Sequence, residues 1–477
     1  MAVSCLSITA LFACVDKDAR SDLNPNLPTD QAQNGDFGDQ GGGSEQGLNF
    51  PVFDDGVLAF PGAEGYGKNV TGARAGEGRE IYHVTNLNDA GPGSFRDAVS
   101  KPWRIIVFDV SGVIKLSSNP IVLKSNQTIL GHTAPGDGIV LYNGRVSASG
   151  AQNLIVRYLR IRMGAAYPSE LDACGIANGA NMIFDHCSMT WGKDECFSIN
   201  PDGKGTAPKN ITIQNSIIGQ GLQNHSCGGL MQTDISNGCT IFRNLYIDNK
   251  TRNPKVKGLN QFVNNVVYNW GRGAAYNMSG DSQGKSETTI ENNYFIVGPC
   301  HNWQNVAQPD GSIKTEYVPM NPARPFTGGN GNFNTYCKGN YYDNNKDGAL
   351  DGVEITETNW SQYCSGSPVF LEARSDLHPI IRSQKSAQEA YEWVVEKVGA
   401  YLPVRDEVDK YLMDELISLG RKGTIIQDER KAEQFPLGGP GTINAAQKPL
   451  DSDNDGMPDA FEDAWGPVSY THLTLPT

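Results

Sequence analysis

The stretch NITIQNSII at residues 210–218 is followed by CTIFRNLYI at 239–247 and NQFVNNVVY at 260–268. Each stretch has a short β-branched or aromatic run, a polar kink and a second short run. Four further stretches align with them: NLIVRYLRIR from Asn153, NMIFDHCSM from Asn181, TTIENNYFI from Thr288 and TYCKGNYYD from Thr335. The kinks recur mostly every 21 to 29 residues, and this spacing is typical of solenoid repeats.

The repeat predicts an all-β fold, a right-handed parallel β-helix in which each coil pairs its open edges with the next coil. A β-sandwich is the alternative, but it requires hairpin turns every 8 to 12 residues or so, and the repeats lack them. Asparagine suits a kink because it tolerates left-handed backbone geometry and its stacked amides can hydrogen-bond. We expect one kink column: Tyr158, His186, Asn215, Asn244, Asn265, Asn293 and Asn340.

Elements around the repeat predict caps for its ends. GPGSFRDAV at residues 91–99, with Ser94 as N-cap, predicts a short helix over the N-terminal end. We therefore place the β-helix domain at 58–372 and a C-terminal helical extension at 373–435. The extension has a capping box at Ser386 and Glu389, and a second predicted helix runs from Asp406 to Leu419.

The two ends of the chain differ from its body. Residues 1–14 resemble a lipoprotein-type signal with Cys14 as the lipidated residue, although a short apolar core strand is the alternative. Residues 15–57 are acidic and Gly-rich, which predicts a disordered linker, and residues 467–477 are typical of a non-native cloning scar. We expect an exported protein, either secreted or an outer-membrane or cell-surface lipoprotein. Membrane attachment is expected only through the lipid, because no other stretch is apolar enough to span.

The net charge limits the classes of binding partner, and the cysteine count leaves the disulfide state open. Of 477 residues, 39 are Lys or Arg and 53 are Asp or Glu, a net charge of −14. The sequence has no basic block to neutralise a phosphate backbone, which argues against a nucleic acid partner. Without Cys5 and Cys14, eight of the ten cysteines remain; disulfides and buried free thiols are both open. We expect a monomer.

Acidic residues on successive predicted coils form a candidate metal site. They are Glu170 and Asp172, then Asp185, then Asp194 and Glu195. Because neighbouring coils stack about 4.8 Å apart, acids on two coils can reach one ion. Calcium takes six to eight oxygen ligands in irregular geometry. The pattern therefore predicts a Ca²⁺ site, and a solvated acidic face is the alternative.

The stretch RNPKVK at residues 252–257 supplies three cations, Arg252, Lys255 and Lys257, in an acidic protein. A cationic groove beside an anionic cluster suits a polyanionic substrate bridged by calcium. Net negative charge would repel such a substrate unless divalent cations intervene, so electrostatics also predicts metal dependence. A structural ion-pair patch is the alternative.

A second calcium site is predicted within residues 436–466. Acids occupy loop positions 1, 3, 5, 9 and 12 with Gly456 at position 6, which matches the EF-hand spacing; they are Asp451, Asp453, Asp455, Asp459 and Glu462. No candidate base accompanies them, so we expect a structural role. A solvated acidic linker is the alternative.

Six motifs together resemble those of the pectate lyases of polysaccharide lyase family 1, especially gut-type Bacteroidetes forms. They are FPGAEGYG at 60–67, VTNLNDAGPGSFRDAV at 84–99, IVFDVSGVI at 106–114, TILGHTAPGDGI at 128–139, FDH at 184–186 and RNPKVK at 252–257. The resemblance spans about residues 58–375. It implies calcium-dependent β-elimination within an α-1,4-linked galacturonan, the backbone of pectin.

The resemblance also implies residue roles. Glu170, Asp172, Asp194 and Glu195 would bind the active-site calcium, although Ser198 stands where the family has an acid. Arg252 would abstract the proton, with its pKa lowered by Lys255, Lys257 and calcium. Lys257 replaces the motif's second arginine, and His225 is the nearest candidate for a family lysine. Asp185 and His186 match the aromatic-x-Asp-His motif, where His186 is expected to be structural.

Two other functions remain open from the residues alone. A pectin hydrolase of the polygalacturonase kind would use two carboxylates about 5 to 9.5 Å apart, which Asp185, Asp194 and Glu195 could supply. A surface glycan-binding solenoid without turnover would also explain the repeat and the charges. The unsaturated product of a lyase distinguishes the three.

Overall fold

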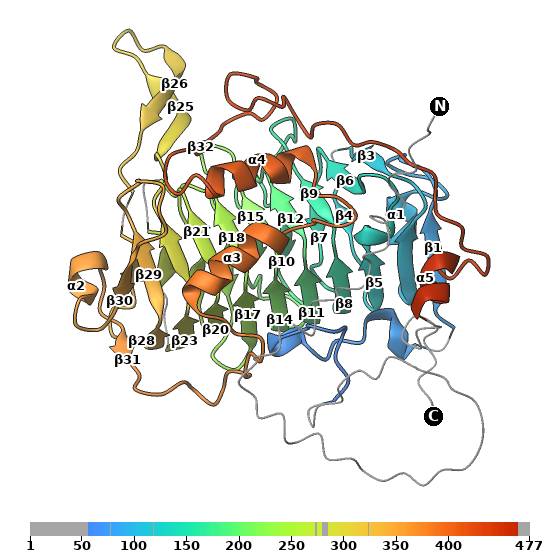
Figure 1. Ribbon diagram of the computed structural model, residues 1–477, viewed down its shortest axis with the longest axis horizontal. Helices are drawn as coiled ribbons and strands as arrows, with labels where there is room; N and C mark the ends of the chain where they lie inside the picture. The colour runs from blue at the N-terminus through green and yellow to red at the C-terminus, as the bar shows by residue number, and fades with distance from the viewer. Residues whose placement is uncertain are drawn as a thin grey trace, which may run out of the picture.

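A computed structural model describes residues 56–465 except 77, 118, 272–273, 279–284 and 323. The described chain winds through three long sheets (Figure 1). The first sheet contains β1 (Glu80–Val84), β2 (Arg104–Phe108), β5 (Gln127–Leu130), β8 (Gln152–Arg157), β11 (Ala180–Asp185), β14 (Lys209–Gln214), β17 (Gly238–Phe242), β20 (Leu259–Val263), β23 (Ser286–Glu291), β28 (Phe333–Lys338) and β31 (Val369–Phe370).

The other two sheets take one short strand from each coil. The second sheet contains β4 (Ile121–Val122), β7 (Val146–Ser147), β10 (Cys174–Ile176), β13 (Phe197–Ile199), β16 (Leu230–Gln232), β19 (Lys255–Lys257), β22 (Tyr276–Met278) and β27 (Phe326–Gly328). The third sheet contains β3 (Gly112–Lys115), β6 (Ile139–Tyr142), β9 (Arg160–Arg162), β12 (Ser188–Thr190), β15 (Ile217–Gly219), β18 (Leu245–Ile247), β21 (Val266–Tyr268), β24 (Tyr294–Ile296), β29 (Asn340–Asp343) and β30 (Val353–Ile355).

Strand pairing between coils is parallel, as in β11 with β14 and β12 with β15. Within the described part, the last pair of the third sheet, β29 and β30, is antiparallel. Each coil contributes one strand to each sheet in turn, so the coils stack along one axis from the N-terminal end to the C-terminal end (Figure 1). The predicted right-handed parallel β-helix is confirmed.

The predicted kink column is two adjacent columns in the structure. Register pairs Gln214 with Phe242, so Asn215 stacks with Arg243 rather than with Asn244. The left-handed residues, all with φ between 50° and 64°, form one column: Tyr158, His186, Asn215, Arg243, Asn264, Asn292 and Gly339. The sequence alignment was wrong by one residue at this point because both columns are polar and rich in asparagine.

The hydrogen-bonded ladder is the second column, one residue later in each coil. The backbone N–H of Asn244 donates to Asn265 Oδ1 at 2.9 Å, and that of Asn265 donates to Asn293 Oδ1 at 2.7 Å. The ladder continues to Asn340 at 3.1 Å. Stacked amides thus satisfy backbone donors at the corner where the strands turn, which keeps a buried turn free of unpaired polar groups.

The core is filled by inward-facing side chains of all three sheets, and the described cysteines lie in it or at its edge. Eight cysteines are buried free thiols: Cys174, Cys187, Cys196, Cys227, Cys239, Cys300, Cys337 and Cys364. Of the two alternatives, the described part of the chain therefore has buried thiols rather than disulfides.

A short helix covers each end of the stack, and the helix at the N-terminal end was predicted. α1 (Phe95–Ala98) follows Ser94, whose Oγ accepts the N–H of Asp97, and Phe95 stacks on Phe108 with ring centroids 5.7 Å apart. At the other end lies α2 (Trp360–Tyr363), which the sequence patterns did not predict. Its Trp360 stacks on Phe326 of the last second-sheet strand at 5.2 Å.

α3 (Ala387–Lys397) and α4 (Glu407–Leu416) lie across the third sheet (Figure 1). The capping box of Ser386 and Glu389 is present, and Asp406 caps α4, which ends three residues before the predicted Leu419. Arg162 of β9 is fully buried and pairs with Asp406 at 2.7 Å and with Asp409 at 2.9 Å. These ion pairs fix the helical extension to the β-helix.

One further segment projects from the stack of coils, and another runs back along it. The antiparallel hairpin of β25 (His301–Ala307) and β26 (Ile313–Pro319) stands out from the coils and pairs with β32 (Thr424–Ile425) at its base. After β32 the chain runs back to the N-terminal coils, where α5 (Asp459–Trp465) lies near β1 (Figure 1). Short 3₁₀ turns at Gly65–Gly67, Gly72–Ala75 and Gly131–Thr133 complete the elements.

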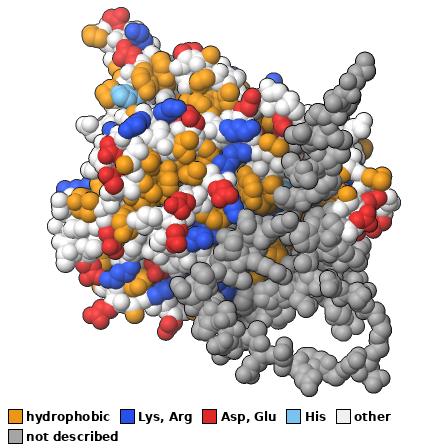
Figure 2. All heavy atoms as spheres, in the orientation of Figure 1, with side chains coloured by type: hydrophobic (Ala, Val, Ile, Leu, Met, Phe, Trp, Pro, Cys, Tyr) orange, Lys and Arg blue, Asp and Glu red, His pale blue; other side chains and the backbone are white. Residues whose placement is uncertain are grey.

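On the face drawn in Figure 2, Lys and Arg side chains lie among acidic and apolar ones. Within the described residues, no helix has the length and apolar character needed to cross a membrane. The predicted signal at 1–14, most of the linker at 15–57 and the scar at 467–477 lie outside the described residues.

Candidate active site

The candidate site lies on the turns that lead from the third sheet to the second. Four such turns follow β9, β12, β15 and β18, and successive coils place them side by side. Glu195 pairs with Cys227, and Cys227 pairs with Thr251, through isolated parallel bridges. The coil stacking thus places the turns that carry Asp172, Glu195, Cys227 and Arg252 along one edge of the β-helix.

Three carboxylates converge on this edge. Asp172, Asp194 and Glu195 each offer an oxygen, and these oxygens lie within 4.8 Å of one another. The backbone N–H of Glu195 donates to Asp172 Oδ1 at 3.3 Å. Burial and the neighbouring Asp172 raise the pKa of Glu195 to about 8, and burial also raises the pKa of Asp172. So much crowded negative charge makes the group a favourable place for a cation.

Glu170, the fourth predicted ligand, lies on the same turn as Asp172 but is exposed. Among the described residues it stands outside the group whose oxygens converge. Its charge acts on His225, one of the groups that face the turn. The structure therefore brings together three of the four predicted acids.

Arg252 reaches the acids from two coils away. Its backbone is left-handed, with φ of 56°, and its Nη1 contacts Glu195 Oε1. Burial lowers the pKa of Arg252, but Cys227 and Glu195 outweigh this effect and raise it. The expected lowering of this pKa is therefore contradicted in the ion-paired arrangement, because an anionic partner holds the guanidinium in its charged form.

Lys255 and Lys257 follow on β19, on either side of the buried Val256. Alternation along a strand places both lysine side chains on the outer face of the second sheet. His225 lies on the turn after β15, with Nε2 2.9 Å from Asp194 Oδ1 and its side chain 43% exposed. Of the predicted substrate-binding residues, His225 thus contacts the acids, and the two lysines follow Arg252 on the next strand.

Comparison with known proteins identifies the family of this chain. A family model described as pectate lyase matches residues 61–343. The chain belongs to the pectate lyase family, and it is a polysaccharide lyase. The "Probable pectate lyase C" of Aspergillus fumigatus is 49% identical over 419 residues, which is 88% of this chain and 90% of the relative. That of Emericella nidulans is 48% identical over 410 residues, 86% of each chain.

Solved structures are more distant from this lyase. A thermostable pectate lyase, PL 47, gives a TM-score of 0.48 at 13% identity and covers 72% of this chain and 97% of its own. The cedar pollen allergen jun a 1 gives a TM-score of 0.46 at 16% identity, with coverage of 70% and 92%. The fold is therefore established here by the strand pairing itself.

Two cations near the site of the lyase were missed from the sequence. The side chains of Arg145 and Asp172 both flank Gly175, where an added Cβ would lie 3.3 Å from Arg145 Nη2 and 3.2 Å from Asp172 Oδ2. Lys250 Nζ donates to Gln223 Oε1 at 3.1 Å, and its charge interacts with that of Arg252. Alignment of the coil that contains β7 would have revealed Arg145, because Val146 pairs with Cys174.

Asp185 lies at another corner of the coil, at the end of β11, and is fully buried. Arg157 Nε is 2.8 Å and His186 Nδ1 2.9 Å from its carboxylate. Burial alone would raise the pKa of Asp185, but His186 and Arg157 bring it well below its usual range. His186 stacks on Tyr158 at 4.7 Å, in keeping with a structural role. A hydrolase pair that includes Asp185 is thus disfavoured.

The C-terminal loop of the lyase brings together Asp451, Asp453 and Asp455, whose oxygens lie within 4.8 Å of one another. Asp459 instead accepts hydrogen bonds from the N–H and Oγ of Ser452, both at 2.6 Å. Glu462 lies on α5 and stands outside the convergent group of described residues.

The loop is packed against the first coil. Gly456 has φ of +90°, and a Cβ there would lie 2.8 Å from Val107 Cγ1, so the turn requires glycine. Lys448 Nζ is 3.1 Å from Asp451 Oδ2 and 3.2 Å from Asp109 Oδ1. The loop therefore links the C-terminal segment to the N-terminal end of the β-helix.

Proposed function

We propose that this lyase is a calcium-dependent pectate lyase that cleaves α-1,4-galacturonan by β-elimination, with Arg252 as the proton acceptor. One observation carries the proposal: the Arg252 guanidinium contacts Glu195 within the group that Glu195 forms with Asp172 and Asp194. A base and a cluster of oxygen ligands therefore face the same space, where one sugar ring could meet both.

The donor set fits calcium. Asp172, Asp194 and Glu195 are hard oxygen ligands from adjacent turns, and burial together with the neighbouring Asp172 and Asp194 raises the pKa of Glu195 to about 8. When bound, calcium would hold the uronate carboxylate and withdraw electron density from it, which makes the C5 proton more acidic. Glu170 is proposed as an outer ligand on the exposed side of the turn.

Residues of the chain itself would carry out proton transfer and substrate binding. Arg252 must leave Glu195 and lose its proton to the medium before it can accept the C5 proton. As that proton moves to Arg252, the C4–O bond breaks, its electron pair goes to the departing sugar oxygen, and a C4–C5 double bond forms. Lys255 and Lys257 on the outer face of β19, with His225, would bind carboxylates of neighbouring sugars.

The proposal includes calcium at the C-terminal loop, through Asp451, Asp453 and Asp455, with Asp459 and Glu462 as further ligands after a small shift. We assign the calcium ion at the C-terminal loop a structural role, because the loop holds the chain against the first coil. The proposal also includes an exported monomer, secreted or attached through a lipid on Cys14, since a pectin polymer is too large to be met inside a cell.

The deciding experiment measures near-ultraviolet absorption of the unsaturated product from polygalacturonate, with calcium and after chelation. We expect absorption only with calcium and its loss in Arg252→Ala. New reducing ends without absorption would indicate the hydrolase, and binding without any product would indicate a glycan-binding solenoid. Activity that survives both chelation and Arg252→Ala would refute the proposal.

A further inference from the structure

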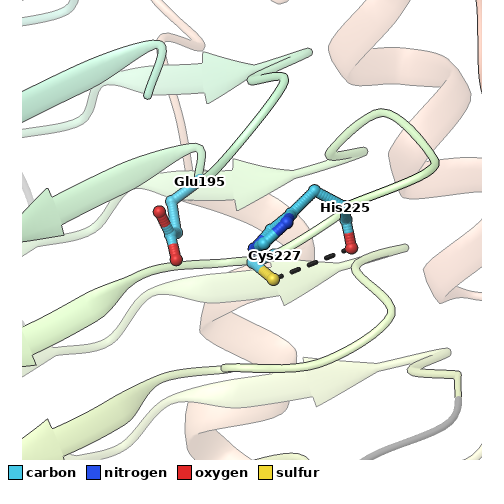
Figure 3. A group of neighbouring side chains, drawn as sticks. All are labelled: Glu195, His225 and Cys227. Carbon is cyan, nitrogen blue, oxygen red and sulfur yellow. Dashed lines mark hydrogen bonds between the residues drawn. The ribbon is translucent and has the colours of Figure 1, made fainter. Parts of the chain in front are cut away.

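Three side chains of different chemistry converge beside the calcium cluster: Glu195, His225 and Cys227 (Figure 3). One carboxylate oxygen, one imidazole nitrogen and the thiol sulfur lie within 4.8 Å of one another. Glu195 and Cys227 are bridge partners on adjacent coils, and His225 is two residues before Cys227 on the same turn. The stacking of coils thus places Glu195 beside Cys227, and the turn places His225 next to both.

Two of these donors are foreign to calcium, which takes oxygen ligands. Imidazole nitrogen and thiolate sulfur are instead the ligands of zinc and similar ions, which bind at about 2.0 to 2.3 Å. Ligand atoms around such an ion lie about 3.3 to 3.8 Å apart, so small side-chain movements within the 4.8 Å group are sufficient. The Cys227 thiol has no role in the proposed elimination.

We propose that Glu195, His225 and Cys227 form a second cation position, selective for thiophilic divalent ions of the zinc class, that shares Glu195 with the calcium cluster. The fourth position is left to water or substrate, as in open zinc sites. Asp194, 2.9 Å from His225 Nε2, supports the ring in the way that outer carboxylates support zinc-binding histidines.

Because Glu195 belongs to both groups, an ion at the second cation position should affect turnover. An ion held by Glu195 would engage the carboxylate that Arg252 contacts and that also belongs to the acidic cluster. Zinc-class ions should therefore inhibit the lyase by competition with calcium. This consequence rests on the proposed function, whereas the binding site itself does not.

Binding is tested with Co²⁺ added to the chelator-treated full chain, because a thiolate–cobalt bond gives a near-ultraviolet charge-transfer band that carboxylates cannot give. We expect this band in the wild type and its loss in Cys227→Ser. His225→Ala removes an exposed side chain without disturbing the core, and it should weaken Co²⁺ binding at least about tenfold. Zn²⁺ should displace Co²⁺ and abolish the band.

The matched control is Cys364→Ser. Cys364 is also a buried free thiol, 1% exposed like Cys227, but it lies after α2 at the far end of the stack. The cobalt band should be unchanged in this variant. No band in the wild type, or a band that persists in Cys227→Ser, would overturn the site.

Inhibition is tested separately. Zn²⁺ should raise the calcium concentration needed for half-maximal rate, and Cys227→Ser should require at least about tenfold more Zn²⁺ for the same effect. Equal Zn²⁺ inhibition of wild type and Cys227→Ser would overturn the inhibitory role. If turnover proves independent of calcium, the proposed function fails, while the cobalt spectrum still decides the second cation position.

Discussion

The Arg252 guanidinium contacts the Glu195 carboxylate across two coils of the β-helix, with Cys227 on the coil between them. Glu195 is 3% exposed at its side chain, whereas Arg252 is 29% exposed. The contact satisfies a nearly buried carboxylate and keeps the guanidinium charged. Under the proposed mechanism, the two groups must therefore separate before Arg252 can act as a base, and the substrate must displace this ion pair.

Arg252→Ala should lower kcat on polygalacturonate by about 10²–10⁴-fold, the usual contribution of a positioned general base. Arg252→Lys keeps the charge and should lose activity as well, because the shorter ammonium cannot reproduce the guanidinium geometry. Initial rates at saturating calcium and substrate measure both, with circular dichroism as the folding control. Rates within a few fold of the wild type would remove Arg252 from the mechanism.

Asp172→Asn should raise the calcium concentration for half-maximal rate at least about tenfold, because it removes one of the three convergent carboxylates. Glu170→Gln is the matched comparison on the same turn, and its exposed position predicts a smaller change. Calcium titrations of the initial rate give both values. A larger effect of Glu170→Gln than of Asp172→Asn would reverse the assignment of inner and outer ligands.

The buried carboxyl pair of Asp248 and Glu415 predicts a pH-dependent stability. Burial raises the pKa of Asp248 from its ordinary 3.8 to about 6, and burial with the neighbouring Asp248 raises that of Glu415 well above its ordinary value. A raised pKa in the folded state means that the folded protein binds the proton more tightly than the unfolded chain does. The stabilisation is therefore complete below pH 4 and is lost as the pH rises past 6.

Asp248→Asn should remove about 2–3 kcal/mol of this pH-dependent difference between pH 4 and pH 8. The measurement is the free energy of unfolding of wild type and variant across that range. Asp414→Asn is the control, because Asp414 lies next to Glu415 on α4 but is exposed and pairs with Lys422 at 2.6 Å. If the free energy of unfolding changed with pH in the same way in the wild type and in Asp248→Asn, the raised pKa of Asp248 would be contradicted.

Arg162→Ala should destabilise the protein by about 3–5 kcal/mol, because it leaves the buried Asp409 without its arginine and Asp406 with only the more distant Arg160, at 3.6 Å. The exposed pair of Lys422 and Asp414 should contribute less than about 1 kcal/mol, so Lys422→Ala serves as the control. Urea unfolding measures both. Similar effects of the two substitutions would mean that the helical extension is not held by its buried ion pairs.

Asp453→Ala should reduce the rise in Tm that calcium produces, without changing the calcium requirement of turnover. The loop's carboxylates are a separate group from Asp172, Asp194 and Glu195, and Lys448 links Asp451 of the loop to Asp109. An ion at 100 times its Kd stabilises the folded state by about 2.7 kcal/mol. Thermal melts with and without calcium measure this effect, and an unchanged calcium-induced shift would exclude metal binding at the loop.

Local patterns in the sequence were sufficient for several features. Ser386 with Glu389 predicted the α3 capping box, and Asp406 predicted the cap of α4, because a cap depends only on residues within one turn. The kink column was wrong by one residue from Asn244 onward, because its alignment depends on the register between coils. Arg145 was missed for the same reason: only pairing of β7 with β10 brings it to Asp172.

The sequence by itself determined the β-helix, the covering helices α1, α3 and α4, and the charged residues of the candidate site. It could do so because the alternation of short strands with kinks, and the capping signals, are properties of the chain within a few residues. Only the tertiary structure decided that Glu195 meets Arg252, that Glu170 stays outside the converging acids and that Cys227 joins them. Those contacts depend on the exact lengths of four turns and the register of four coils, because residues up to 57 positions apart meet only after the coils have stacked.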